Sequence, residues 1–148
     1  MIIEQSMSLS QQTKTRVIKW IAIWVVWTLF ALFFASQLAL QMQFSKNAVP
    51  LSKILSWQLV SGYVWFALTP LILFLARRFP FDMGRWKVSL SIHIVTGLLI
   101  ALFQQSIDAT LLPRLGYPPG MEFESFWAAY KLFVSFNLHL SLLIYWGT

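Results

Sequence analysis

The chain has 148 residues and a formal net charge of +6, yet only 11% of its residues are charged. Hydrophobic residues reach 58%, aromatic residues 17%, and there is no Cys. A water-soluble domain of this size has too much surface to cover with so few charges, because charged residues make up about 25% of typical globular chains. The composition therefore excludes a soluble enzyme, a disordered segment and a disulfide-stapled secreted module, and it indicates an integral membrane protein.

Four long apolar segments predict four membrane-spanning helices, at about residues 17–40, 54–76, 88–112 and 126–148. An α-helix rises about 1.5 Å per residue, so about 20 apolar residues cross the hydrocarbon core of a bilayer. The polar residues 1–16 lack a clear apolar helical period, and we expect them to form a mobile cytoplasmic tail. The predicted fold is thus all-α and integral to the membrane, a bundle of four transmembrane helices.

The first two spans each carry one feature that bears on their interpretation. Lys14, Arg16 and Lys19 precede the first span as in a signal peptide, but the apolar stretch is too long and no small-x-small cleavage site follows. We therefore expect an uncleaved anchor. The second span contains Thr69-Pro70, where the missing amide of proline should loosen or kink the helix, so both residues are candidates for a conformational switch.

The third span is the most polar of the four. One of its faces carries a small or polar residue at every fourth position: Ser89, His93, Gly97, Ala101 and Gln105. In a bilayer such a stripe should face other helices, because small residues permit close approach and polar residues find partners there. The plain interpretation is a packing seam. The functional alternative is a small intramembrane pocket or a proton-sensitive switch built around His93, and Gln105 is a further candidate on the same stripe.

Three further candidates are Asp108 on the third span and Asn137 and His139 on the fourth. Asp108 lies near the outer end of the third span, and we expect it to be hydrated or paired with Arg114 rather than part of an ion path. Within the fourth span, Asn137 shares a face with Ser141, and His139 shares another with Ser135; we expect hydrogen bonds between helices from these polar side chains.

The fourth span ends in an unusual way. After Lys131 only residues 132–148 remain, fewer than the roughly 20 that a full crossing needs. No basic residue follows Tyr145-Trp146 to anchor the far end. We therefore expect the last helix to be incomplete and the sequence to be a fragment or a truncated reading frame. The alternative is that the protein naturally ends at Thr148.

The distribution of Lys and Arg predicts the orientation in the membrane. One side would hold seven of them: Lys14, Arg16, Lys19, Arg77, Arg78, Arg85 and Lys87. The other side would hold four: Lys46, Lys53, Arg114 and Lys131. The excess places the N-terminus, the middle loop and the C-terminus in the cytoplasm. Because these residues flank apolar runs, we expect contact with the lipid bilayer and no direct contact with nucleic acid.

No pattern for catalysis is visible in the chain. It has no glycine-rich phosphate loop, no pair of carboxylates, no nucleophile elbow and no zincin motif. Two His and one Asp within the spans do not make a metal site by spacing alone. We therefore predict no catalytic, cofactor-binding or metal-binding residue in this sequence.

Several segments resemble one family. They are Leu68-Thr69-Pro70-Leu71-Ile72-Leu73-Phe74-Leu75-Ala76-Arg77-Arg78-Phe79-Pro80, Arg85-Trp86-Lys87 with His93 after it, Phe34-Ala35-Ser36-Gln37, and Leu143-Ile144-Tyr145-Trp146. Together they resemble the N-terminal membrane region of LytS-type sensor histidine kinases, the group with the internal-region kinase domain. The resemblance covers nearly all of the chain from about Ile18, and its motifs are membrane-segment patterns.

The resemblance implies a function that lies largely outside this sequence. In such kinases the fourth helix continues into a cytoplasmic linker, a phosphoacceptor His in a His-Phe-x-Phe-Asn-like motif, and a domain that binds ATP with Mg²⁺. It further implies a homodimer, a LytTR-type response regulator as partner and a bacterial inner membrane. Neither His93 nor His139 sits in that motif, so neither is expected to be the phosphoacceptor. The expected mechanism is a signal that shifts helix packing and is relayed through the fourth helix.

Two other functions compete with a sensor region. A stand-alone small membrane protein could act by binding partner helices, and it would require a true stop codon after Thr148. A transporter or channel subunit would require polar residues across several helices. The polar groups concentrate on the third and fourth spans, so transport is the weakest of the three interpretations.

Overall fold

The computed structural model describes the backbone of residues 2–44, 49–81 and 84–148, and the side chains of these ranges at residue 11 and from residue 13 onward. Four α-helices follow one another, with a short 3₁₀ turn after the third: α1 (Ile2–Gln43), α2 (Leu51–Arg78), α3 (Trp86–Leu111), η1 (Pro113–Leu115) and α4 (Phe126–Gly147). No strand occurs in the described ranges. The predicted all-α fold with four helices is therefore confirmed.

All four helices are long and apolar enough to cross a membrane. The candidate spans are Thr13–Gln43, Leu51–Arg78, Trp86–Leu115 and Phe126–Gly147. Each overlaps one of the four predicted spans, so the chain is a multi-pass membrane protein. One difference concerns residues 1–16, because α1 is already helical from Ile2. Once a helix is nucleated, adding residues to its end costs little, so a polar stretch without apolar period can continue it.

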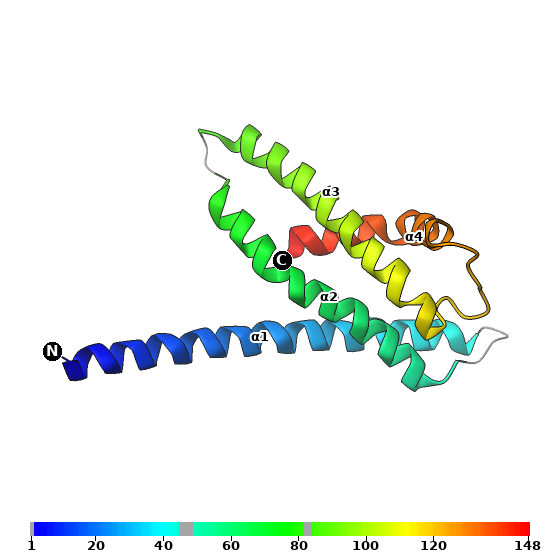
Figure 1. Cartoon of the computed structure of the whole chain (residues 1–148), viewed down its shortest axis with the longest axis horizontal. Helices are drawn as coiled ribbons and strands as arrows, with labels where there is room; N and C mark the ends of the chain where they lie inside the picture. The colour runs from blue at the N-terminus through cyan, green and yellow to red at the C-terminus, as the bar shows by residue number, and fades with distance from the viewer. Residues whose placement is uncertain (1, 45–48, 82–83) are drawn as a thin grey trace.

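The helices pack mainly in two pairs, α1 along α2 and α3 along α4, and a smaller contact joins α2 to α3 (Figure 1). At the first pair, a Cβ atom added to Gly62 would lie 3.0 Å from the Cβ atom of Ala31. Ala31 and Ala35 are almost fully buried. Small residues on both helices therefore allow the close approach of α1 and α2, as is common for helices in lipid.

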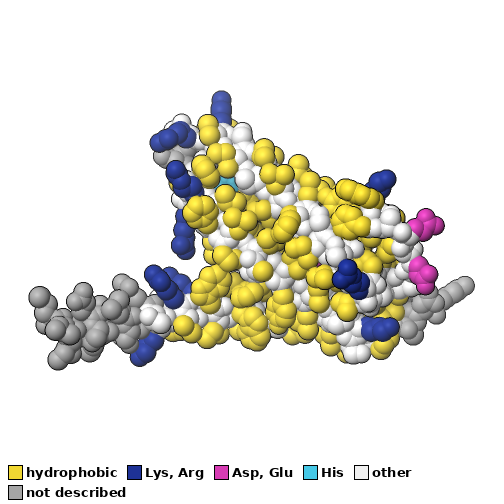
Figure 2. Space-filling model, viewed as in Figure 1, with side chains coloured by type: hydrophobic (Ala, Val, Ile, Leu, Met, Phe, Trp, Pro, Cys, Tyr) yellow, Lys and Arg dark blue, Asp and Glu magenta, His cyan; other side chains and the backbone are white. Residues whose placement is uncertain are grey.

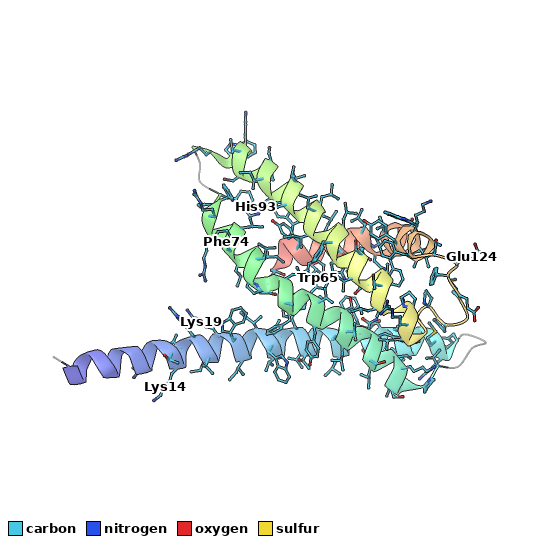
Figure 3. The ribbon with its side chains drawn as sticks, viewed as in Figure 1. Lys14, Lys19, Trp65, Phe74, His93 and Glu124 are labelled. Atoms are coloured by element: carbon cyan, nitrogen blue, oxygen red, sulfur yellow. The ribbon has the colours of Figure 1, made fainter. Side chains whose placement is uncertain are left out.

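Charged and apolar side chains separate along the molecule. Figure 2 shows Lys and Arg around the connection between α2 and α3 and along the N-terminal part of α1, whereas the opposite end carries the visible acidic groups together with further Lys and Arg. Figure 3 shows the same separation in Lys14 and Lys19 on α1 and Glu124 before α4. Between the two ends the surface is largely hydrophobic, with exposed large side chains such as Phe33, Phe74 and Phe136. This surface suits the hydrocarbon core of a bilayer.

Candidate functional site

The polar stripe of α3 lies inside the helix bundle. Its five residues, Ser89, His93, Gly97, Ala101 and Gln105, are all buried. A Cβ atom added to Gly97 would lie 2.8 Å from two ring atoms of Tyr145 on α4. The stripe is thus a packing seam, as its plain interpretation predicts. Two separate polar clusters lie along it, and they involve different neighbours.

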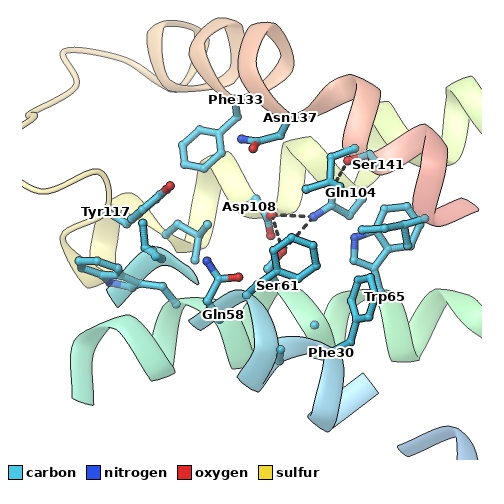
Figure 4. A pocket seen from close by; sticks show the side chains of 18 of the residues that line it. Phe30, Gln58, Ser61, Trp65, Gln104, Asp108, Tyr117, Phe133, Asn137 and Ser141 are labelled. Carbon is cyan, nitrogen blue, oxygen red and sulfur yellow. Dashed lines mark hydrogen bonds between the residues drawn. The ribbon is translucent and has the colours of Figure 1, made fainter. Parts of the chain in front are cut away.

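The first, which we call the Asp108 cluster, consists of Ser61 on α2, Gln104, Gln105 and Asp108 on α3, and Ser141 on α4. Asp108 is only 5% exposed. Its Oδ2 atom accepts hydrogen bonds from Ser61 Oγ at 2.9 Å and from Gln104 Nε2 at 2.6 Å (Figure 4). The Gln104 amide also donates to Ser61 Oγ at 3.3 Å. These bonds tie α2 to α3.

The same cluster continues to α4. Ser141 Oγ donates to Gln104 Oε1 at 3.1 Å and accepts from Gln105 Nε2 at 2.6 Å. A continuous chain of hydrogen bonds therefore runs from Ser61 on α2, through Asp108 and Gln104 on α3, to Ser141 on α4, and Gln105 joins it at Ser141. Within lipid, such bonds between helices fix their relative register because the alternative is an unpaired polar group in hydrocarbon.

Two acceptors of the Asp108 cluster have no partner. Asp108 Oδ1 and Gln105 Oε1 are buried and make no hydrogen bond to any residue that the structure describes. Leaving a buried acceptor unpaired costs about 1–3 kcal/mol, and more for a charged group. The two oxygens therefore mark a place where this network is incomplete.

The cluster borders a cavity of about 320 Å³ that is lined by all four helices. Aromatic rings form much of its wall: Trp27, Phe30, Phe34, Trp57, Trp65, Tyr117 and Phe133. Asp108, Gln105, Gln58 and Asn137 supply polar groups, and neither Gln58 nor Asn137 bonds to another side chain in the described ranges. Figure 4 shows the Asp108 cluster among these residues. The cavity is thus apolar and aromatic with a few hydrogen-bonding groups, which is the usual character of a small-molecule site.

Tyr117 belongs to the segment between η1 and α4 and contributes to the cavity wall. Burial, and secondarily the nearby Asp108 carboxyl group, raises the pKa of Tyr117 above its ordinary value of 10.0. The phenol is therefore neutral at physiological pH and adds no charge to the cavity. Trp57 Nε1 donates to the Leu115 carbonyl at 2.9 Å. This bond holds η1 against α2, two residues before Tyr117.

The second cluster, which we call the His93 cluster, consists of His93, Thr96, Tyr145 and the Phe79 carbonyl. His93 Nε2 lies 3.0 Å from that carbonyl oxygen, which can only accept, so Nε2 carries a hydrogen. In the neutral ring Nδ1 then accepts from Tyr145 Oη at 2.9 Å. Thr96 Oγ1 lies 3.0 Å from the same hydroxyl. The cluster joins α3 to α4 and to the end of α2.

The candidate pair on α2 occupies a third position. Thr69 is buried; its hydroxyl accepts from Trp27 Nε1 at 2.8 Å and donates to the Trp65 carbonyl at 2.9 Å. Pro70 is exposed, and α2 continues through it from Leu51 to Arg78. Thr69 therefore links α1 to α2, and it forms no hydrogen bond with a residue of either polar cluster.

The structure corrects the expectation for Asp108. We expected it to be hydrated or paired with Arg114, but it is buried and bonded to Ser61 and Gln104, while Arg114 is exposed. The reason is helix periodicity: Gln104 precedes Asp108 by one turn, and both point toward α2. This i, i+4 pair was the signal in the sequence that could have placed Asp108 inside.

The candidate residues on α4 differ in whether they bond to another helix. Ser141 makes the bonds between helices that we expected, and Asn137 lines the cavity without a bond. His139 is exposed, and Ser135 donates to the Lys131 carbonyl in its own helix. The expected bonds between helices are thus found on the Asn137–Ser141 face, through Ser141, and not on the His139 face. Ser61 and Gln104 were missing from the candidate list, although both are central to the cluster.

No protein-family model, curated protein or solved structure matches this chain. Among the residues that the structure describes, no three His, Cys, Asp or Glu side chains group closely enough to hold a metal ion.

Proposed function

We propose that this chain is the membrane-embedded sensor and anchor region of a two-component sensor histidine kinase. In this proposal α4 relays a signal from the bilayer to a cytoplasmic kinase domain outside this sequence, which binds ATP and Mg²⁺, and the LytTR-type response regulator is the downstream partner. The protein works as a homodimer in a bacterial inner membrane, with both ends of this chain in the cytoplasm. The sequence resemblance suggests this role.

One structural observation supports the relay: α4 is held by polar contacts at two levels. Ser141 bonds to Gln104 and Gln105, and one turn further on Tyr145 bonds to His93. A change at the Asp108 cluster would move Ser141, and with it the end of α4. Because hydrogen-bonded helix contacts have discrete arrangements, such a change would shift the population between two packings.

Basic residues support the proposed orientation. Arg77, Arg78, Arg85 and Lys87 gather near the α2–α3 connection, at the same end as Lys14 and Lys19. Positive residues favour the cytoplasmic side of bacterial membrane proteins. Tyr145 contacts His93, whose other ring nitrogen bonds to the end of α2, so the last turn of α4 lies at this end as well.

The experiment is to sequence the gene through and beyond the codon for Thr148. We expect an open frame that encodes a basic helical linker and a His-Phe-x-Phe-Asn-like motif, and the full-length protein should then autophosphorylate with ATP in membranes. A stop codon directly after Thr148, together with an intact native mass of 17.2 kDa, would refute the kinase proposal.

The alternative is a small membrane protein that binds partner helices. The exposed large side chains of α1, among them Trp24, Leu29 and Phe33, support it, because α1 contacts mainly α2 and leaves much of its circumference free for lipid or another helix. This alternative is the one that a stop codon would leave standing.

A further inference from the structure

We propose that the cavity beside the Asp108 cluster binds a small organic ammonium ion with an apolar body. This inference deepens the proposed sensor function, on which its role as a signal rests, by naming the chemical class of the ligand. It stands on the geometry of the cavity, the unpaired acceptors in its wall and the charge of its lining.

The unpaired acceptors call for a hydrogen-bond donor. Asp108 Oδ1 and Gln105 Oε1 belong to residues that line the cavity and are at least nine-tenths buried. The other oxygen of Asp108 is already bonded to Ser61 and Gln104. An ammonium group carries three hydrogens, so a single group can serve several acceptors. Gln58 and Asn137 add two further amide oxygens to the lining of the same cavity.

The charge of the lining selects a cation. Asp108 is the one ionisable acid that lines the cavity, and no Lys, Arg or His from the described residues lines it. Asp108 also forms no ion pair within the described part of the chain. An uncompensated carboxylate is costly in a medium of low dielectric constant, and a bound cation removes that cost. An anionic ligand would face the carboxylate with no basic side chain to compensate.

The walls select the rest of the ligand. Trp27, Trp57 and Trp65 are buried and line the cavity together with Phe30 and Phe133. Aromatic faces attract cations, and their area buries an apolar body. A volume of about 320 Å³ is at the lower end of the roughly 300–1,000 Å³ of small-molecule sites, so the ligand is small.

Occupancy would act on α4 through Gln104. A donor at Asp108 Oδ1 withdraws electron density from the carboxyl group that Gln104 contacts, and Gln104 is bonded to Ser141. The site and the relay therefore share the same hydrogen bonds. Two sources offer this chemistry, namely a free amine and the primary ammonium of a phosphatidylethanolamine headgroup.

The test uses the full 148-residue chain in phosphatidylcholine nanodiscs, whose quaternary headgroup cannot donate a hydrogen bond. Equilibrium dialysis with radiolabelled 2-phenylethylamine is compared with dialysis against empty nanodiscs. We expect saturable binding that 3-phenylpropionate and the neutral 2-phenylethanol do not displace. Asp108→Asn should weaken it at least tenfold, about 1.4 kcal/mol. The control Glu124→Gln removes the same charge from an exposed loop and should leave binding unchanged.

A second variant covers the case in which Asp108→Asn fails to fold. Asn137→Phe keeps every hydrogen bond of the Asp108 cluster and fills the cavity, so it should also abolish binding. A second arm replaces part of the lipid with phosphatidylethanolamine. If this lipid competes with the amine and co-purifies with the parent chain but not with Asp108→Asn, the headgroup is the source; if it does neither, the source is a free amine.

The proposal is overturned if neither the amine nor the ethanolamine lipid binds in a way that depends on Asp108, or if the anion or the alcohol competes equally. These results are separate from the kinase test. Binding by a chain whose gene stops after Thr148 would retain the site and refute the kinase, whereas an active full-length kinase without amine binding would refute only the site.

Discussion

The two polar clusters of α3 differ in how completely their hydrogen-bonding groups are used. In the His93 cluster both ring nitrogens have partners, and Phe81 stacks on the ring at 5.1 Å between centroids. In the Asp108 cluster two buried oxygens have no partner among the described residues, and a cavity lies beside them. Helix packing alone explains the first cluster. The second carries an energetic cost that packing does not explain, which is why the ligand site is inferred there.

The comparison also changes the role of His93. From the sequence it was the centre of a possible switch, and that role stays a prediction. In the structure its ring is engaged on both sides and lies 5% exposed. A switch at His93 would have to break the bonds to Tyr145 and Phe79, whereas a ligand can bond to the unpaired oxygens of the Asp108 cluster without first breaking a bond.

The largest effect should come from disturbing the closed cluster at its closest contact. In Gly97→Ala the new methyl group meets the Tyr145 ring at 2.8 Å, so the ring must shift away from His93. We expect the free energy of unfolding in detergent to fall by about 1–3 kcal/mol. Gly147→Ala is the matched control, because a Cβ atom there meets nothing within 4 Å. Equal stability of the two variants would contradict the tight α3–α4 seam.

A smaller effect is expected when only the hydroxyl group of the closed cluster is removed. Tyr145→Phe leaves His93 Nδ1 without its donor, and hydrogen bonds between membrane helices are worth about 0.6 kcal/mol on average and at most about 1.7. We therefore expect a loss of about 1 kcal/mol in the same unfolding assay. Tyr63→Phe removes a hydroxyl from an exposed ring and should change stability little. If both variants behaved alike, the His93–Tyr145 bond would contribute nothing.

The fold could be predicted because its signal is local. Apolar runs of about 20 residues identify helices in lipid without knowledge of any long-range contact. The buried face of α3 could also be predicted, because the four-residue period from Ser89 to Gln105 indicates that this stripe faces other helices, and all of its residues are buried. What the sequence could not supply was the partner of each polar group. Ser61 meets Asp108 only because α2 and α3 cross at that level, 47 residues apart along the chain.

The same reasoning explains why the prediction for Asp108 was wrong. Asp108 lies four residues before the end of the predicted third span, where a carboxylate can reach water, and Arg114 is close in sequence. In the structure the apolar span continues to Leu115, so Asp108 lies further from the end of the span than predicted. Its side chain also points toward α2, and it is therefore buried. The existence of the cavity was likewise beyond sequence reasoning, because all four helices contribute to its wall.

The smallest expected effect sharpens the contrast between the clusters. Without added amine, Asp108→Asn replaces the carboxyl group by an amide whose oxygen can still accept from Ser61 and Gln104, while the uncompensated charge disappears. A buried charge that lacks a counter-ion is costly to keep in a medium of low dielectric constant, and its removal relieves that cost. We therefore expect the free energy of unfolding to rise by up to about 1 kcal/mol, opposite in sign to the change in Tyr145→Phe. A loss larger than that of Tyr145→Phe would show that the carboxylate is already compensated in the folded chain, and the contrast between an open and a closed cluster would no longer hold.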